Sequence, residues 1–115
     1  MKKQIKEKSA QYLKIVKWSD EDKCYVGTCP GLFFGGCHGQ DEVAVYKELC
    51  EVVDEVIENM IKGKEKFPEP TAKEYSGKFL VRVKPEIHQR AVLAAAERHQ
   101  SLNAFVGEAL AEAVS

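Results

Sequence analysis

The sequence has no long hydrophobic run and no excess of charge of either sign. A membrane helix needs about 20 consecutive apolar residues, and residues 1–12 are basic without the apolar core of a secretory signal. With 17 Lys and Arg against 18 Asp and Glu, the chain is no polycation. Any contact with nucleic acid therefore has to come from a local arrangement of positive groups. These absences predict a cytoplasmic protein that makes no membrane contact.

Alternating residues near the N-terminus predict two paired strands. The stretch QYLKIVKW at 11–18 alternates with a period of two, as a half-buried strand does. The acidic connection SDEDK follows, and CYVGTCPG at 24–31 resumes the extended pattern. So short a polar connection predicts a hairpin. The glycine-rich LFFGGCHG that comes next suits a short third strand or a packed loop.

A broad apolar stripe predicts one long helix between residues 41 and 63. Asp41 is a suitable N-cap, and Gly63 ends the pattern. The apolar residues recur at steps of three or four, which is the spacing of a helix that lies across a sheet. The stripe comprises Val45, Leu49, Val52, Val56 and Met60, widened by Tyr46, Val53, Ile57 and Ile61.

A linker and a short C-terminal segment complete the chain. Residues 63–75 hold prolines and charges without periodicity, as linkers do. The stretch GKFLVRVK at 77–84 then alternates as a strand. One face of this strand has Lys78, Leu80 and Arg82, and the other has Phe79, Val81 and Val83. No later strand exists to pair with it, so its edge invites a second chain.

Two helices are expected after this strand. Pro85 suits the first position of a helix, and Ser101 is a good N-cap for a last helix. Strand, helix, helix in about 40 residues is near the lower limit for a unit that folds alone. We therefore expect a homodimer whose two strands pair antiparallel, as a ribbon that fits the major groove of DNA.

These patterns predict an α+β fold. Its first part, residues 1–70, is a small antiparallel sheet with one long helix. Its second part, residues 76–115, is a tail that dimerises.

The C-terminal sequence GKFLVRVKPEIHQRAVLAAAERHQSLNAFVGEALAEAV resembles a ribbon-helix-helix DNA-binding domain. The likeness rests on the alternating strand, the PEIH helix start, the alanine-rich helix and the SLNAFVGEAL helix. It implies that the base-reading residues are Lys78, Leu80 and Arg82, and that the phosphate anchor is Ser101, Leu102 and Asn103. Leu80 departs from this pattern in its chemistry, because it can touch a thymine methyl but cannot donate a hydrogen bond.

The first 70 residues are similar to the partial ribonuclease H-like domain of HicB-type antitoxins. This likeness rests on YLKIVKWSDEDKCYVGTCPGLFFGGCHG, the helix after it and FPEP at 67–70. The resemblance implies the antitoxin of a HicA/HicB toxin–antitoxin system. Its first domain would bind and cover a HicA toxin, a small basic RNA-cleaving protein. Its paired tails would bind operator DNA and repress the shared operon, in a dimer or a dimer of dimers.

The acidic turn between the first two strands is the expected contact for a basic toxin. Asp20, Glu21 and Asp22 form a compact cluster that can steer such a partner by its charge. We expect the aromatic residues beside the turn, Trp18 and Tyr25, to join this contact. The alternative is that the acidic residues only form a polar hairpin turn.

The sequence predicts no enzyme. Two-metal phosphodiester cleavage needs carboxylates that converge from separate elements, whereas the acidic residues before the long helix are bunched in one turn, apart from Asp41 and Glu42. Adjacent residues of an extended segment point to opposite faces, so Cys37 and His38 form no nucleophile–base pair. We expect no catalytic residue, no cofactor and no bound metal.

A ligand-responsive repressor is the alternative from a different class. Its front domain would sense a metal or a small molecule through Cys24, Cys29, Cys37 and His38. No CxxC pair occurs among the cysteines, and zinc sites usually have closely spaced ligand pairs. The spacing therefore favours reduced thiols over zinc or disulfides.

Overall fold

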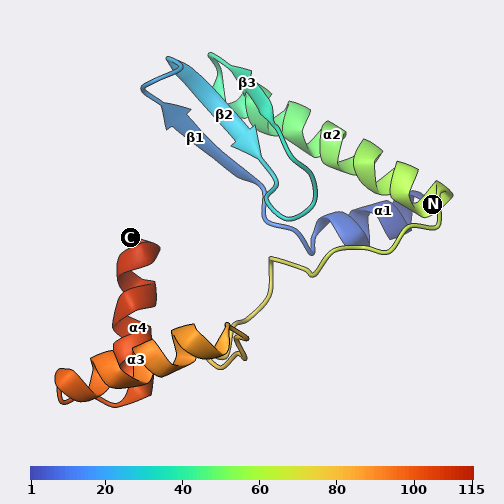
Figure 1. Ribbon diagram of the computed structural model, residues 1–115. Helices are drawn as coiled ribbons and strands as arrows, with labels where there is room; N and C mark the ends of the chain where they lie inside the picture. Colours follow the sequence, from blue (N-terminus) through green and yellow to red (C-terminus); the bar gives the residue numbers. More distant parts are fainter. The chain divides into compact units, whose positions relative to one another are not determined.

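The computed structural model describes all 115 residues. It has four helices and three strands, in the order α1 (Lys2–Ser9), β1 (Ile15–Ser19), β2 (Cys24–Thr28), β3 (Cys37–Gly39), α2 (Glu42–Lys62), α3 (Pro85–Glu97) and α4 (Leu102–Ala113) (Figure 1). These elements fall into two compact units, Met1–Tyr75 and Ser76–Ser115. The fold is α+β with a small antiparallel sheet, as predicted. None of the helices has the length and apolarity needed to cross a membrane.

The sheet of the first unit has the strand order β1-β2-β3, with both pairs antiparallel. The predicted hairpin is confirmed, with Trp18 of β1 opposite Tyr25 of β2. The glycine-rich stretch supplies the short third strand, whose His38 lies opposite Val26. β1 begins only at Ile15, later than the alternation suggested. The amides of residues 11 and 12 bond instead to the last turn of α1.

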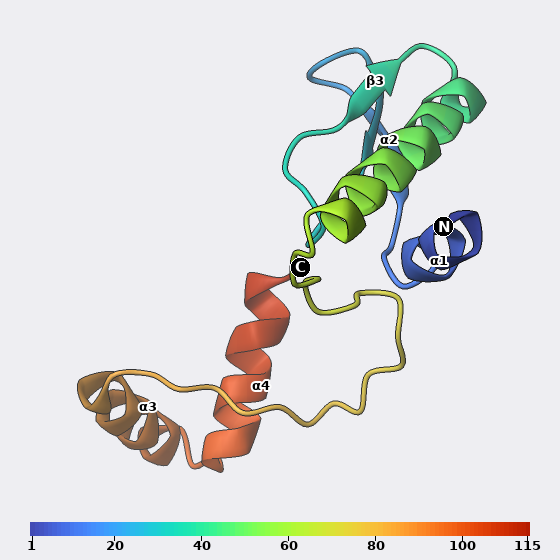
Figure 2. The same cartoon turned by 90° about the vertical axis from the view of Figure 1, so that its right-hand side faces the viewer.

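Helix α2 covers one face of this sheet (Figures 1 and 2). Its predicted ends are confirmed: the Asp41 side chain accepts a hydrogen bond from the Ala44 amide at 3.1 Å, and Gly63 is the C-cap. Gly27 of β2 lets the helix approach, because a Cβ there would lie 3.1 Å from a methyl of Val45. The buried residues of α2 are Val45, Leu49, Val53 and Ile57.

The centre of the apolar stripe on α2 differs from the prediction. Val52, Val56 and Met60 were placed at its centre, but they are only partly buried. The wide stripe contains two overlapping rows of apolar residues along the helix. Only the elements that pack against the helix decide which row faces the core. Those partners are the sheet and α1, which packs against α2.

The first helix, α1, was not predicted, because its residues are mostly charged and lack an apolar stripe. It leads directly into Tyr12, whose side chain is 2% exposed and lies in the core. The Tyr12 hydroxyl donates a hydrogen bond to the carbonyl oxygen of Pro68 at 2.6 Å. Lys8 of α1 places its ammonium 4.5 Å from the centre of the Phe67 ring. Residues near the N-terminus therefore hold a segment that lies more than 50 positions later in the chain.

Part of the stretch predicted as a linker is folded onto the first unit. The amides of Thr71 and Ala72 both donate to the Gln11 carbonyl at 3.0 Å, and the Leu13 amide donates to the Thr71 hydroxyl at 2.8 Å. We call this docking of residues 67–72 on residues 8–13 the clasp. The predicted linker over residues 63–75 has no helix or strand, but its middle part belongs to the first unit, which extends to Tyr75. A sequence pattern does not reveal hydrogen bonds between such distant backbone segments.

In the second unit, α3 and α4 begin where the sequence predicts. Pro85 is the first residue of α3, and the Ser101 hydroxyl caps α4 by accepting from the Ala104 amide at 3.0 Å. Ala95 is the only buried residue of this unit. Two helices with so small a core leave much apolar surface in contact with water.

Candidate functional site

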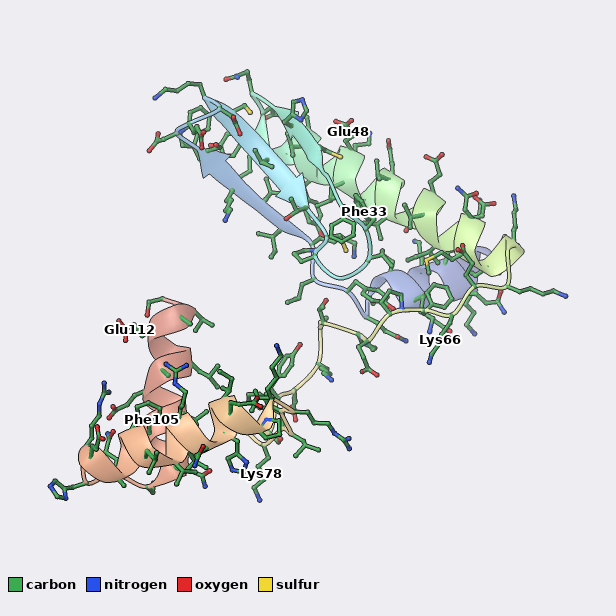
Figure 3. The ribbon with its side chains drawn as sticks, in the orientation of Figure 1. Phe33, Glu48, Lys66, Lys78, Phe105 and Glu112 are labelled. Carbon is green, nitrogen blue, oxygen red and sulfur yellow. The ribbon has the colours of Figure 1, made fainter.

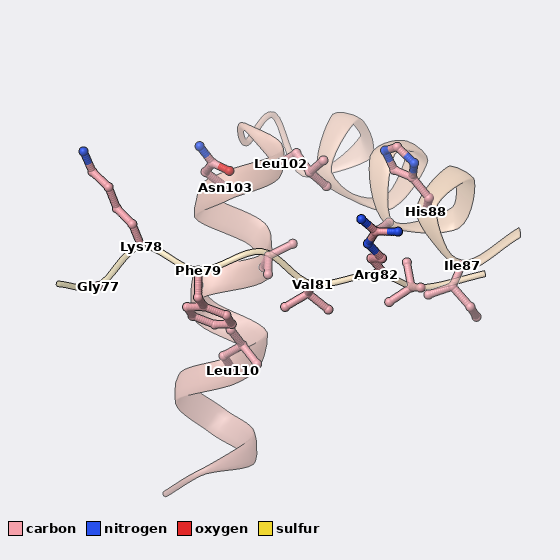
Figure 4. Close-up of a pocket in the computed structure, with 14 residues that line it drawn as sticks. Gly77, Lys78, Phe79, Val81, Arg82, Ile87, His88, Leu102, Asn103 and Leu110 are labelled. Atoms are coloured by element: carbon pink, nitrogen blue, oxygen red, sulfur yellow. The ribbon is translucent and has the colours of Figure 1, made fainter. Parts of the chain in front are cut away.

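An apolar groove of about 1060 Å³ lies between residues 77–83, α3 and α4 of the second unit (Figure 4). The apolar side chains that line it are Phe79, Val81, Val83, Ile87, Ala91, Leu102, Val106 and Leu110. Several of them are well exposed, with 70% of Phe79 and 59% of Val81 accessible to solvent. Exposed apolar side chains gathered in one groove are the kind of surface that a partner can bury.

The side chains of residues 78–82 alternate between two sides. In Figure 4, Phe79 and Val81 point to one side of the backbone, and Lys78 and Arg82 point to the other. The long side chains of both cations also reach the lining of the groove, whereas Leu80 does not contribute to it. The alternation expected from the sequence is thus present in the side-chain directions.

The backbone of this segment is unpaired in the single chain. Residues 79–83 make no backbone hydrogen bond and belong to no strand. The segment is bounded by Ser76, whose hydroxyl accepts from the Lys78 amide at 3.0 Å, and by Lys84, the N-cap of α3. One extended segment cannot form a ladder by itself, so the paired strand stays a prediction. Its unpaired amides and carbonyls are the template that such pairing needs.

The three residues of the expected phosphate anchor lie at the start of α4. The Ser101 hydroxyl is occupied by the cap, Leu102 is half-buried, and Asn103 is exposed. The amides of Leu102 and Asn103 have no acceptor within the chain. Unbonded amides at the start of a helix can bind an anion, because they lie at the positive end of its dipole.

The acidic turn of the first unit is ordered by its own side chains. The Trp18 indole donates to a carboxylate oxygen of Asp20 at 2.9 Å and packs edge to face against Tyr25, with ring centres 5.1 Å apart. The Ser19 hydroxyl accepts from the amide of Asp22 at 3.1 Å and lies 3.3 Å from its carboxylate. The structure thus brings Asp20 and Tyr25 each into direct contact with Trp18 at one end of the hairpin.

The carboxylates of the turn have both a structural role and an exposed surface. Asp20 and Asp22 take part in the bonds that form the turn, as the alternative of a polar hairpin turn requires, whereas Glu21 makes no such bond. All three remain exposed. The turn therefore presents a fixed acidic surface, and its contact with a toxin stays a prediction.

The residues suggested as metal ligands are not assembled into a site. No three side chains of His, Cys, Asp or Glu lie close enough together to hold a metal ion. Cys29 and Cys37 are buried in the core, and burial raises the pKa of both thiols, which keeps them protonated. Cys24, Cys29, Cys37 and His38 therefore do not form a metal site in this structure.

Sequence reasoning overlooked two side chains that the structure leaves exposed. His88 on α3 lines the apolar groove. Phe34 is fully exposed in the loop between β2 and β3, next to Phe33, which packs against the core. The sequence signal for Phe34 was the pair of adjacent aromatic residues Phe33 and Phe34, of which only Phe33 packs against the core.

Comparison with known families gives a match to part of the chain. The model of the HicB family matches residues 61–110, from the end of α2 into α4. The matched range contains every residue predicted to contact DNA and none of the acidic turn. Comparison with curated proteins and with solved structures finds no match.

Proposed function

Because its match over residues 61–110 identifies the chain as a member of the HicB family, we propose that it neutralises an RNA-cleaving toxin and represses its own operon. At the level of the family it is a HicB-type antitoxin, and the family implies a partner of the HicA kind. The first unit binds the toxin directly, and the second unit dimerises and binds operator DNA. Both activities take place in the cytoplasm, where the toxin and the operon meet.

The observation that supports dimerisation is the uncovered groove beside an unpaired backbone segment. A second copy of residues 79–83 can pair antiparallel with the first, which satisfies the backbone groups of both chains. The same pairing turns Phe79, Val81 and Val83 of each chain towards the helices of the pair. Removing such side chains from water stabilises the pair by up to about 1.5–3 kcal/mol for each one that is fully buried.

DNA binding follows from what this pairing leaves outside. The outward side of the two-stranded ribbon has Lys78, Leu80 and Arg82 from each chain, and such a ribbon fits the major groove. Arg82 and Lys78 can donate to guanine O6 and N7. The amides of Leu102 and Asn103 can bind a backbone phosphate on either side. A dimer of dimers on adjacent sites is compatible with this arrangement.

Charge supports the assignment of toxin binding to the first unit. Residues 1–75 contain 12 Lys and Arg against 14 Asp and Glu, a net −2, whereas residues 76–115 contain 5 against 4, a net +1. The three adjacent carboxylates of the acidic turn concentrate more negative charge in one place than this small difference in net charge between the units. An exposed acidic turn beside an exposed indole can attract a basic protein and then pack against it.

The decisive test of the repressor activity is the substitution Arg82→Ala. Loss of a base contact should weaken operator binding by about 1–3 kcal/mol and relax the preference for one sequence. Gel-shift titrations at one fixed salt concentration measure both effects. Arg90→Ala, which removes an exposed cation of α3 outside the segment, is the matched control and should change binding less. Equal losses in the two variants would contradict the assignment.

A further inference from the structure

Leu80 occupies an unusual position for a large apolar side chain. It is 82% exposed and does not line the apolar groove. Two positions away on either side, Lys78 and Arg82 point away from the apolar face of the segment (Figure 4). Leu80 shares their side, because residues two apart in an extended segment point the same way. A single exposed leucine needs no explanation, but a dimer brings two of them together.

The pairing geometry places these two leucines at the middle of the outer face. Opposite residues of an antiparallel pair share one face, so outward residues can face only outward residues of the other chain. Registers centred on Leu80, on Val81 or on Arg82 all keep the pairing near the middle of residues 79–83. The two Leu80 side chains are directly opposite in the first register and diagonal neighbours in the second. The register centred on Leu80 gives the ribbon an apolar centre with cationic flanks, because each Lys78 then lies opposite an Arg82 on either side of the two leucines.

We propose that the paired Leu80 side chains select thymines, through their 5-methyl groups, at the centre of each operator site. The thymine methyl is the one apolar group that base pairs present in the major groove. Because the dimer has two-fold symmetry, one such thymine lies on each DNA strand. This inference rests on the proposed function. It adds the chemical group of the DNA that Leu80, the apolar one of the three base-reading residues, recognises.

The charges of Lys78 and Arg82 beside Leu80 favour DNA over a protein as the partner of this outer face. A protein surface that covered Leu80 would also remove water from Lys78 and Arg82, which is costly unless both charges find partners. DNA can supply those partners, since phosphates border the groove in every sequence and neighbouring guanines present acceptors in it. The outer face of the ribbon, with its apolar centre between two cationic ends, therefore matches the major groove.

The test alters the DNA and leaves the protein intact. The operator is located by footprinting with the full-length protein, and the central thymines are then replaced by uracil, which lacks only the methyl group. Binding should weaken about fourfold for each methyl that Leu80 contacts, as expected for one buried methyl-sized group. Leu80→Ala should bind the thymine and uracil operators equally well. The exposure of Leu80 predicts that this variant still folds and dimerises, which sedimentation equilibrium checks.

Lys78→Ala is the matched control for this effect. It should weaken binding to both operators and preserve the ratio between them, because it removes a charge and no methyl contact. Equal affinity of the unaltered protein for thymine and uracil operators would overturn the role of Leu80 while leaving the repressor function intact. Failure to bind any operator DNA would overturn the proposed function, and the inference with it.

Discussion

At the residue scale, Tyr12 shows how one side chain connects distant parts of the first unit. Its ring is in the core, and its hydroxyl bonds to Pro68, 56 positions later in the chain. Burial is also the main cause that raises the pKa of this hydroxyl, so it stays a donor at neutral pH. The alternation of residues 11–18 predicted an extended segment here, but no local pattern indicates the bond to Pro68.

We expect Tyr12→Phe to lower the free energy of unfolding of the first unit by about 1 kcal/mol, because a partly buried carbonyl loses its donor while the ring keeps its packing. Trp18 is the only tryptophan and lies in this unit, so its fluorescence during urea denaturation measures the change. Tyr75→Phe is the control, since the Tyr75 hydroxyl bonds to Thr71 at an exposed position. Equal effects in the two variants would mean that the Pro68 bond contributes little.

At the element scale, local signals predicted the helix ends, and distant packing decided the rest. Asp41, Gly63, Pro85 and Ser101 act within one turn of their own positions, so their roles can be inferred from neighbouring residues. The orientation of α2 depends on the sheet and on α1, which come from elsewhere in the chain. The presence of α1 itself also depends on packing against α2, because its own residues favour no buried face.

The candidate DNA-binding site shows the same division between local and distant information. The two faces of residues 78–82 follow from alternation alone, and the structure displays them. The groove beside them needs α3 and α4 packed together, which periodicity indicates only as two apolar stripes. In the acidic turn, composition revealed the charge but not the bonds of Asp20 and Asp22 (Figure 3 displays the side chains of this region).

We expect the two faces of this segment to respond oppositely to the same substitution. Val81→Asp places a charge on the face that a second chain buries, so the protein should become monomeric. Leu80→Asp places the same charge on the outer face between two cations, so the dimer should remain. Sedimentation equilibrium of the full-length variants measures this, with Trp18 fluorescence as a check on the first unit. Two monomers, or two dimers, would contradict the proposed ribbon.

At the scale of the whole molecule, the clasp determines how much chain connects the two units. Residues 67–72 are held by hydrogen bonds to residues 11–13, so only a few residues after Ala72 remain before the segment that begins at Lys78. The proposed division of labour assigns toxin binding to the first unit and DNA binding to the second. A cut between the units should therefore separate the two activities, provided that it leaves the clasp in place.

We expect residues 1–75 to unfold at the same urea concentration as the full-length protein, to protect cells from a co-expressed HicA-type toxin, and to lose operator binding. Residues 1–66 form the matched control, because this fragment lacks the clasp and loses its four hydrogen bonds. At about 0.5–1.5 kcal/mol for each bond, that fragment should be less stable by about 2–6 kcal/mol. Growth arrest despite a folded fragment 1–75 would contradict the proposed division of labour. Because the fragment keeps the stability and the charge of the first unit, that result would show that toxin binding needs the second unit.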